Sequence, residues 1–200
     1  DENVYYNRTS KKTSTRGLRD FHNKYIKRKL IVDASKRGDT LIDMTVGKGG
    51  DLPKWIDAKL SFVFGVDIAK DNIENRIDGC CSRYLKMHKK YNTLPRALFA
   101  HANSSLNLSS GEAFFNEKGK HIMNALNGVG AKDKESLGMG VYRQFGKHRE
   151  GFDIVSNMFS IHYFFENSET FHNFLQNVSE NCKIGGYFVG CCYNGKKIFR

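Results

Sequence analysis

Four residues of this chain have the types and spacing that suit a nucleoside-containing cofactor. Gly47, Gly49 and Gly50 lie between a strand-like run and a helix-like run, and Asp67 ends the next strand-like run. A glycine loop lets backbone N–H groups approach a ligand, and an acid after the second strand can accept hydrogen bonds from both hydroxyls of a ribose. Asp67 follows Gly47 by about 20 residues, as expected in a βαβ unit. A tight turn without a ligand and a dinucleotide cofactor are alternatives that this spacing leaves open.

The elements that position these residues alternate between strands and helices. Strands are predicted over residues 40–45, 61–67, 97–101, 152–159 and 186–192, and helices over residues 51–56, 71–89 and 168–181 and from Leu18 to the turn at Gly38. This alternation predicts an α/β fold with a mostly parallel sheet flanked by helices. Residues 111–151 are rich in Gly, Lys and Asn, so we expect a loop or mobile insertion there.

The composition indicates one domain with a polyanionic partner. A chain of 200 residues with 40% hydrophobic content is long enough for a single core. We expect a flexible basic arm over residues 1–16 and one domain over residues 17–200 that is incomplete at its C-terminal end. The net charge of +11 is concentrated near the N-terminus, which favours a polyanion such as a nucleic acid. A solvated basic face explains a lysine and arginine count equally well.

Cysteine and hydropathy patterns exclude several other classes of protein. The five cysteines form no Cys-x-x-Cys pair, so no metal site is predicted and the thiols are expected to be reduced. No apolar run approaches the roughly 18–20 residues that a membrane span needs. We therefore expect an intracellular protein with no membrane partner.

Residues 43–55 resemble the signature of the cap guanine-N7 methyltransferases of eukaryotes and large DNA viruses, through Gly-Lys-Gly-Gly-Asp-Leu followed by Lys-Trp. The resemblance recurs in order at residues 18–27, 65–69, 102–105, 159–166 and 185–188. It implies a Rossmann-like class I methyltransferase with S-adenosylmethionine as cofactor and capped RNA (GpppRNA) as substrate. It also implies a cytoplasmic or nuclear location, cytoplasmic or virion-associated for a viral protein, and other capping-enzyme domains in the same longer chain.

The resemblance assigns two groups of site residues. The cofactor group comprises Lys27, Asp43, Gly47, Asp67, Asn103, Ser104, Met158 and Tyr163. The cap group comprises Asn23, Lys48, Lys54, Arg83, His162 and Tyr163, with the three cations near the cap phosphates. Three positions depart from the family pattern: Thr45 replaces a glycine, Asn103 an aspartate and Met158 a glutamine. His162 and Tyr163 as core residues, and Lys48 and Lys54 as surface lysines, are the plainer interpretations.

The implied reaction needs no general base, so no catalytic residue is predicted. Guanine N7 carries a free lone pair and loses no proton on methylation, which leaves alignment and a suitable electric field as the requirements. The two prolines, Pro53 and Pro95, stand in no motif for cytosine-C5 or amino-directed methylation. A non-catalytic RNA-binding or stimulatory module with the same fold is the alternative function. A nucleotide-dependent oxidoreductase fits less well, because the glycine spacing departs from the dinucleotide pattern.

Overall fold

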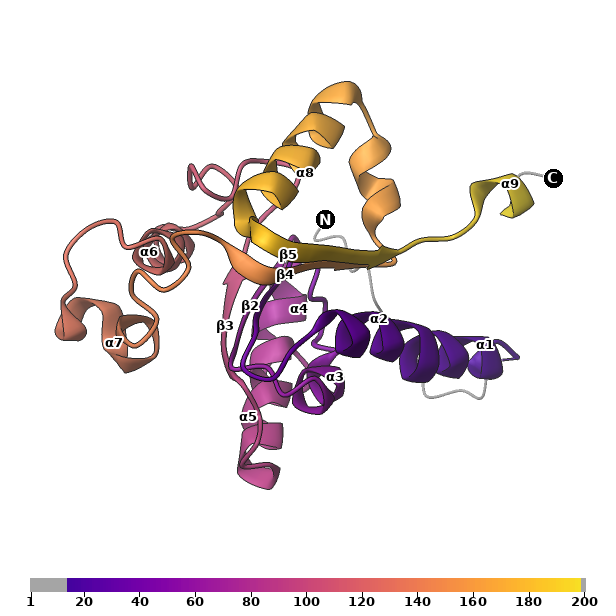
Figure 1. Ribbon diagram of the computed structural model, residues 1–200, viewed down its shortest axis with the longest axis horizontal. Helices are drawn as coiled ribbons and strands as arrows, with labels where there is room; N and C mark the ends of the chain where they lie inside the picture. The colour runs from indigo at the N-terminus through magenta and orange to yellow at the C-terminus, as the bar shows by residue number, and fades with distance from the viewer. Residues whose placement is uncertain (1–13, 199–200) are drawn as a thin grey trace.

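A five-stranded parallel sheet forms the centre of the molecule in the computed structural model, which describes residues 14–198 (Figure 1). The strands are β1 (Thr40–Asp43), β2 (Phe62–Asp67), β3 (Arg96–His101), β4 (Phe152–Met158) and β5 (Cys182–Cys191). Their order is β3-β2-β1-β4-β5, and each neighbouring pair is parallel. Because the order reverses between β1 and β4, the carboxyl end of β1 lies where α/β sheets bind ligands. The predicted α/β fold with a parallel sheet is confirmed.

Helices cover both faces of this sheet. The first face carries α2 (Lys27–Ala34), α3 (Leu52–Asp57), α4 (Lys70–Glu74) and α5 (Cys80–Lys90). The second carries α6 (Glu117–Leu126) and α8 (Ser168–Asn181), with α7 (Lys134–Tyr142) packed against α6. A short helix, α9 (Gly195–Ile198), follows β5. The helix predicted from Leu18 is confirmed as α1 (Arg16–Phe21), a π-helical turn η1 (His22–Ile26) and α2 in succession.

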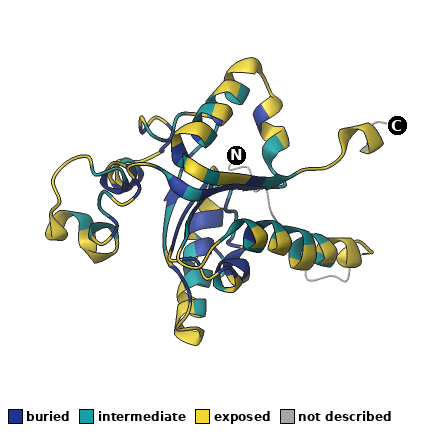
Figure 2. Cartoon of the chain, viewed as in Figure 1, coloured by how far each residue is buried: buried dark blue, intermediate teal, exposed yellow. Residues whose placement is uncertain are grey.

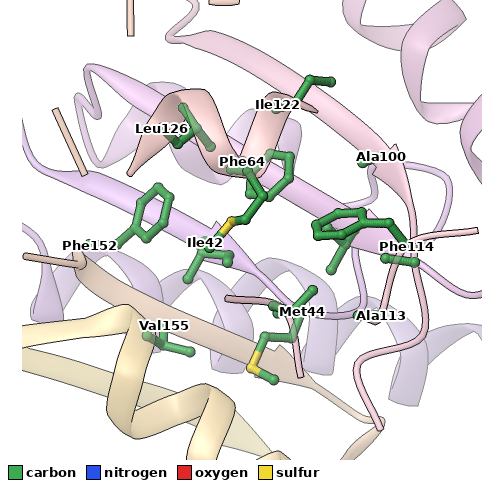
Figure 3. Close-up of a cluster of buried hydrophobic side chains, with 14 of the residues drawn as sticks. Ile42, Met44, Phe64, Ala100, Ala113, Phe114, Ile122, Leu126, Phe152 and Val155 are labelled. Carbon is green, nitrogen blue, oxygen red and sulfur yellow. The ribbon is translucent and has the colours of Figure 1, made fainter. Parts of the chain in front are cut away.

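Two apolar cores lie on the two faces of the sheet. Figure 2 shows buried residues concentrated in the central strands and in the parts of the helices that cover them. Adjacent residues of one strand point to opposite faces, so Val63 packs with the first-face helices and Phe64 with the second-face helices. Figure 3 shows the second-face core, where Phe64 lies near Ile42, Phe114 and Leu126. Helices therefore bury the strand side chains on both faces, as is usual for a parallel sheet covered on both sides.

The loop predicted over residues 111–151 is wrong, because α6 and α7 form there. Ile122, Met123 and Leu126 of α6 are buried against the second face of the sheet. Asn116 caps α6 by accepting a hydrogen bond from the Gly119 N–H at 2.8 Å. The helical spacing of these apolar residues was concealed by the glycines and lysines around them, and burial outweighs the low helix propensity of glycine.

Some other boundaries also differ from the sequence predictions. The helix predicted over residues 71–89 is broken into α4 and α5 before Gly79, where a Cβ would approach the Asn75 N and O atoms to 2.6 Å. Strand β5 begins at Cys182, four residues before the predicted start. Most of the predicted basic arm, residues 1–13, lies outside the described residues. No helix within residues 14–198 has the length and apolarity to cross a membrane.

The edge strand β5 exposes apolar side chains, and we expect it to drive self-association of the 200-residue chain. Ile184 is fully exposed and Tyr187 is 57% exposed on this terminal strand of the sheet. An exposed apolar edge pairs readily with a second chain, whereas lysine opposes such pairing. Ile184→Lys should therefore lower the dimer fraction in sedimentation velocity, while Leu85→Lys on exposed α5 should not. Equal dimer fractions in the two variants would contradict a β5 interface.

Candidate functional site

The glycine loop after β1 has a backbone that only glycine adopts readily. Gly47 and Gly49 have φ angles of 54° and 69°, in the left-handed region. A Cβ at Gly49 would lie 2.9 Å from the Cys80 Sγ atom and 3.0 Å from Leu52. The loop is held to β2 by the Val46 N–H, which donates to the Val66 carbonyl at 2.9 Å. The predicted strand, loop and helix are all present.

Asp67 joins this loop to the end of β2. Its carboxylate accepts hydrogen bonds from the Gly47 N–H at 2.8 Å, the Ala69 N–H at 2.9 Å and the Asn72 side-chain amide at 2.9 Å. The residue is 7% exposed and lines a large cleft. A carboxylate has about four lone-pair positions, so these three bonds leave one on Oδ2 for a ligand hydroxyl.

A buried cluster of charged side chains, Lys27, Asp51 and Lys54, packs against the glycine loop. The Asp51 carboxylate contacts the Lys54 ammonium at 2.8 Å and the Lys27 ammonium at 3.4 Å. Lys54 also donates to the Gly50 carbonyl at 3.1 Å and is only 6% exposed, so its charge is directed at the loop. Lys27 reaches the cleft, with its ammonium 5.6 Å from the centre of the Phe159 ring. Of these two predicted site lysines, only Lys27 lines the cleft.

Asp43 lies behind the loop, buried at 2% exposure and outside the cleft lining. Burial raises its pKa to about 7, and the nearby Asp51 charge adds to this, while the Thr45 N–H that donates to Asp43 opposes it. Its carboxyl group is therefore half protonated near neutral pH. The geometry gives it a role in holding Thr45 beneath the loop.

The titration of Asp43 makes a pH-dependent contribution to stability. The folded state raises the pKa of Asp43 from 3.8, its value in the unfolded chain, to about 7. The protonated carboxyl group therefore contributes stability that is fully present below about pH 4 and is lost as the pH rises through about 7. Asp43→Asn keeps an acceptor for the Thr45 N–H but cannot ionise, so it should stabilise the protein above pH 7 by about 4 kcal/mol. Urea unfolding of both proteins from pH 4 to pH 8 measures this. Parallel stability curves would show that Asp43 does not titrate in that range.

The loop after β3 presents Asn103 and Ser104 to the cleft. The Ser104 hydroxyl donates to the Met44 carbonyl at 2.6 Å, and the Asn103 side-chain oxygen accepts from the Ser105 N–H at 2.9 Å. Fully buried Asn177 of α8 holds this loop by donating to the Ser104 carbonyl at 2.9 Å. The same amide group bonds the Leu106 carbonyl, and its oxygen accepts from the Leu108 N–H. The amide of Asn177 thus holds Ser104 directly and fixes the loop that also carries Asn103.

An aromatic group follows β4. Phe159 has a φ of 62°, which is strained for a non-glycine residue. Its ring contacts His22 edge-on with centroids 5.0 Å apart and lies 5.4 Å from the Tyr193 ring. Tyr163 of the 3₁₀ helix η2 (Ile161–Phe165) is 57% exposed and lines the same cleft. The His162 ring is tilted by 41° against the Tyr163 ring, with centroids 4.2 Å apart, and His162 does not line the cleft.

His22 and Tyr193 line the cleft but were not among the predicted site residues, whereas residues 157–160 were predicted to form an aromatic slot that includes Phe159. An aromatic residue directly after a buried strand was the available signal for Phe159, because parallel strands present their carboxyl ends to the ligand edge. No local pattern distinguishes His22 or Tyr193. Met158 is 5% exposed and packs its sulfur 3.7 Å from the Cys191 thiol.

Lys48 and Arg83 line the cleft with their polar groups already bonded. The Lys48 ammonium pairs with Asp71 at 3.0 Å and Asp78 at 2.9 Å, and its side chain is 11% exposed. The Arg83 guanidinium donates to the Lys48 carbonyl at 2.6 Å. A phosphate bound at Lys48 would therefore compete with two carboxylates.

These elements surround an open cleft of about 1510 Å³ at the carboxyl ends of the strands. The predicted residues that line it are Asn23, Lys27, Gly47, Lys48, Asp67, Arg83, Asn103, Ser104, Met158 and Tyr163. Asp43, Lys54 and His162 do not line it. The Thr45 hydroxyl, on the cleft wall, is buried without a hydrogen-bond partner among residues 14–198. A nucleoside cofactor fits this donor set, because Asp67 offers an acceptor for ribose and the loop offers close backbone approach.

The parallel sheet, the glycine loop and the acid that ends β2 define a Rossmann-like fold of the S-adenosylmethionine-dependent methyltransferase class. A family model described as the mRNA (guanine-N(7))-methyltransferase domain matches residues 3–200. The chain therefore belongs to the mRNA (guanine-N(7))-methyltransferase family, as its motifs implied.

Curated relatives carry corresponding names. The chain is 25% identical over 199 residues to a probable mRNA-capping enzyme of Acanthamoeba polyphaga mimivirus, covering 98% of this chain and 15% of that protein. It is 32% identical over 173 residues to the mRNA cap guanine-N(7) methyltransferase of Saccharomyces cerevisiae, covering 86% and 31%. The enzyme of the same name from Candida glabrata is also 32% identical, with coverage of 86% and 33%. The chain thus spans 33% or less of the length of each of these three relatives.

Proposed function

We propose that this chain transfers the methyl group of S-adenosylmethionine to N7 of the guanosine cap of mRNA. The observation that carries the proposal is the single cleft in which the Asp67 loop network and the aromatic group of Phe159 and Tyr163 face one space. Family membership supports it, and the three relatives are named as capping or cap-methylating enzymes. The non-catalytic alternative rests on the departures from the family pattern at Thr45, Asn103 and Met158, and family membership does not favour it.

The residues divide the proposed work between the two sides of the cleft. S-adenosylmethionine supplies a methyl group on a positively charged sulfur. Asp67 and the Gly47 loop hold the ribose and methionine portions, and Asn103 and Ser104 approach the adenine. Asn103 keeps one lone pair on its side-chain oxygen for an adenine amino group, although without the strength of a carboxylate.

The aromatic side of the cleft receives the guanine base. Phe159 and Tyr163 offer ring faces for stacking. Asn23 lines the same space, and its side-chain amide can both donate and accept hydrogen bonds. N7 attacks as a neutral nucleophile, so these residues align it and no proton is removed. The product guanine gains positive charge on methylation, which aromatic faces accommodate.

The RNA chain is proposed to follow the basic surface at the cleft mouth. Arg16, Arg19 and Lys24 line that mouth on the helix α1–η1. Lys24 is partly neutralised by Asp20 at 3.0 Å, in an exposed pair that contributes little. Cationic groups in this position bind phosphates with a strong dependence on salt concentration.

We further propose that residues 17–200 form one intracellular methyltransferase domain, and that other capping domains share its full-length chain. The mimivirus relative, of which this chain covers 15%, supports the second proposal.

The test is methyl transfer to a GpppRNA oligonucleotide from labelled S-adenosylmethionine, with ApppRNA as the control substrate. We expect label on GpppRNA only, at the position released by N7-specific depurination. Tyr163→Ala should lower transfer about tenfold or more through lost stacking. Tyr187→Ala, an equally exposed tyrosine on β5, should leave it unchanged.

Two results would overturn the proposal. Binding of S-adenosylhomocysteine in calorimetry without transfer to GpppRNA would reject the substrate. No binding of S-adenosylhomocysteine would favour the non-catalytic module instead.

A further inference from the structure

The ribose of a nucleoside cofactor carries two neighbouring hydroxyl groups, but the Asp67 carboxylate has little acceptor capacity left for them. Its Oδ1 atom accepts hydrogen bonds from the Ala69 N–H and from the Asn72 side-chain amide, each at 2.9 Å, which occupy both of its lone pairs. Its Oδ2 atom accepts the Gly47 N–H at 2.8 Å and keeps one lone pair. A ribose whose two hydroxyls both donate therefore needs a second acceptor beside Asp67.

Asn72 of α4 is the side chain placed to supply that acceptor. It is 8% exposed and lines the same cleft as Asp67. Its amide nitrogen must face Asp67, because a carboxylate only accepts hydrogen bonds, so the amide oxygen is directed away from Oδ1. That oxygen accepts no hydrogen bond within residues 14–198 and is not one of their fully buried unpaired atoms. It is therefore accessible from the cleft.

The position of Asn72 is fixed by its neighbours in the chain. Its backbone N–H donates to the Ala69 carbonyl at 3.0 Å, and the Ala69 N–H is itself bonded to Asp67. The following residue, Ile73, is 3% exposed and packs in the core on the first face of the sheet. The Asn72 amide and the Asp67 carboxylate are thus held together before any ligand binds. Such a preformed pair of acceptors binds a ligand with little loss of conformational freedom.

We infer that Asn72 accepts a hydrogen bond from one ribose hydroxyl of S-adenosylmethionine while Asp67 accepts one from the other. The inference deepens the proposed function and rests on it, because it requires the cofactor in this cleft. A neutral amide suits this place better than a second acid does. It donates to the Asp67 carboxylate, whereas a second carboxylate would repel it.

Calorimetry of the whole chain with S-adenosylhomocysteine and with its 2′-deoxy and 3′-deoxy forms tests the inference. In the native chain, loss of either hydroxyl should weaken binding about tenfold. Asn72→Leu keeps the size of the side chain but removes the acceptor, so it should weaken binding of S-adenosylhomocysteine about tenfold or more. One of the two deoxy forms should then bind this variant within about twofold of S-adenosylhomocysteine, because the hydrogen bond that it lacks is already absent.

Two further variants control for changes in packing. Asn124→Leu makes the same substitution on exposed α6, outside the cleft, and should keep the native affinity and the native sensitivity to both deoxy forms. Asn72→Ala removes the acceptor without adding apolar bulk and should reproduce the result of Asn72→Leu. Circular dichroism confirms that each variant is folded.

The deoxy forms distinguish a contact with the ribose from support of Asp67. If Asn72 only holds Asp67, both Asn72 variants lose affinity but remain as sensitive to each deoxy form as the native chain, and the inference is overturned. Native affinity in both Asn72 variants also overturns it. Absence of S-adenosylhomocysteine binding by the native chain rejects the cofactor site itself, whereas the other two results reject the role of Asn72 alone.

Discussion

Asp67→Ala is expected to weaken binding of S-adenosylhomocysteine by about a hundredfold or more and to reduce methyl transfer to background. The substitution removes the acceptor proposed for a ribose hydroxyl. It also leaves the Gly47 and Ala69 N–H groups without their partner, so the glycine loop keeps only the backbone bond from Val46 to Val66 of β2. Calorimetry gives the affinity, and transfer of label to GpppRNA gives the activity.

The matched control for this variant is Asp57→Ala. Asp57 is a partly exposed carboxylate at the end of α3, paired with Arg28 at 2.9 Å and outside the cleft lining. Its loss should leave both measurements within about twofold of the native values. Asp67→Ala with native affinity would remove Asp67 from the cofactor site.

Asp51→Ala should lower the free energy of unfolding by about 3–5 kcal/mol. Asp51 is the shared partner of Lys27 and Lys54, whose side chains are 14% and 7% exposed. Removing the carboxylate leaves two ammonium groups close together with little solvent, which is costlier than losing an exposed ion pair. Urea unfolding followed by circular dichroism measures the difference.

Two further variants separate charge from packing at this position. Asp33→Ala breaks the exposed Lys29 pair and should change the free energy of unfolding far less than Asp51→Ala does. Asp51→Ala combined with Lys54→Met should regain part of the lost stability, because one buried charge is removed with its partner. If Asp51→Ala costs no more than Asp33→Ala, the cluster under the loop contributes no net stability.

The proposed cofactor side of the cleft was predictable because it is local in the sequence. Gly47 and Asp67 belong to one βαβ unit, in which strand direction and connection fix the distance between the loop and the strand end. The spacing alone therefore placed both residues at one edge of the sheet, where the structure has them bonded at 2.8 Å.

The aromatic side depends on contacts that sequence patterns do not encode. Phe159 meets His22 because β4 pairs with β1 and a helix from the N-terminal region crosses the same edge. Lys48 was predicted from its motif alone, and its two carboxylate partners come from α4 and the turn before α5. Such pairings are set by tertiary packing, which also produced α6 where composition predicted a loop.

Because Cys80 packs against the glycine loop, the rate at which its thiol is alkylated can report how often the loop opens. Cys80 is fully buried, and burial raises the pKa of its thiol, whereas Cys192 is exposed. An alkylating reagent therefore reaches Cys80 only when α5 and the loop around Gly49 separate. Its modification rate reports the frequency of that opening, in the way that amide exchange reports local unfolding. A ligand that closes the loop slows this rate without requiring any other signal.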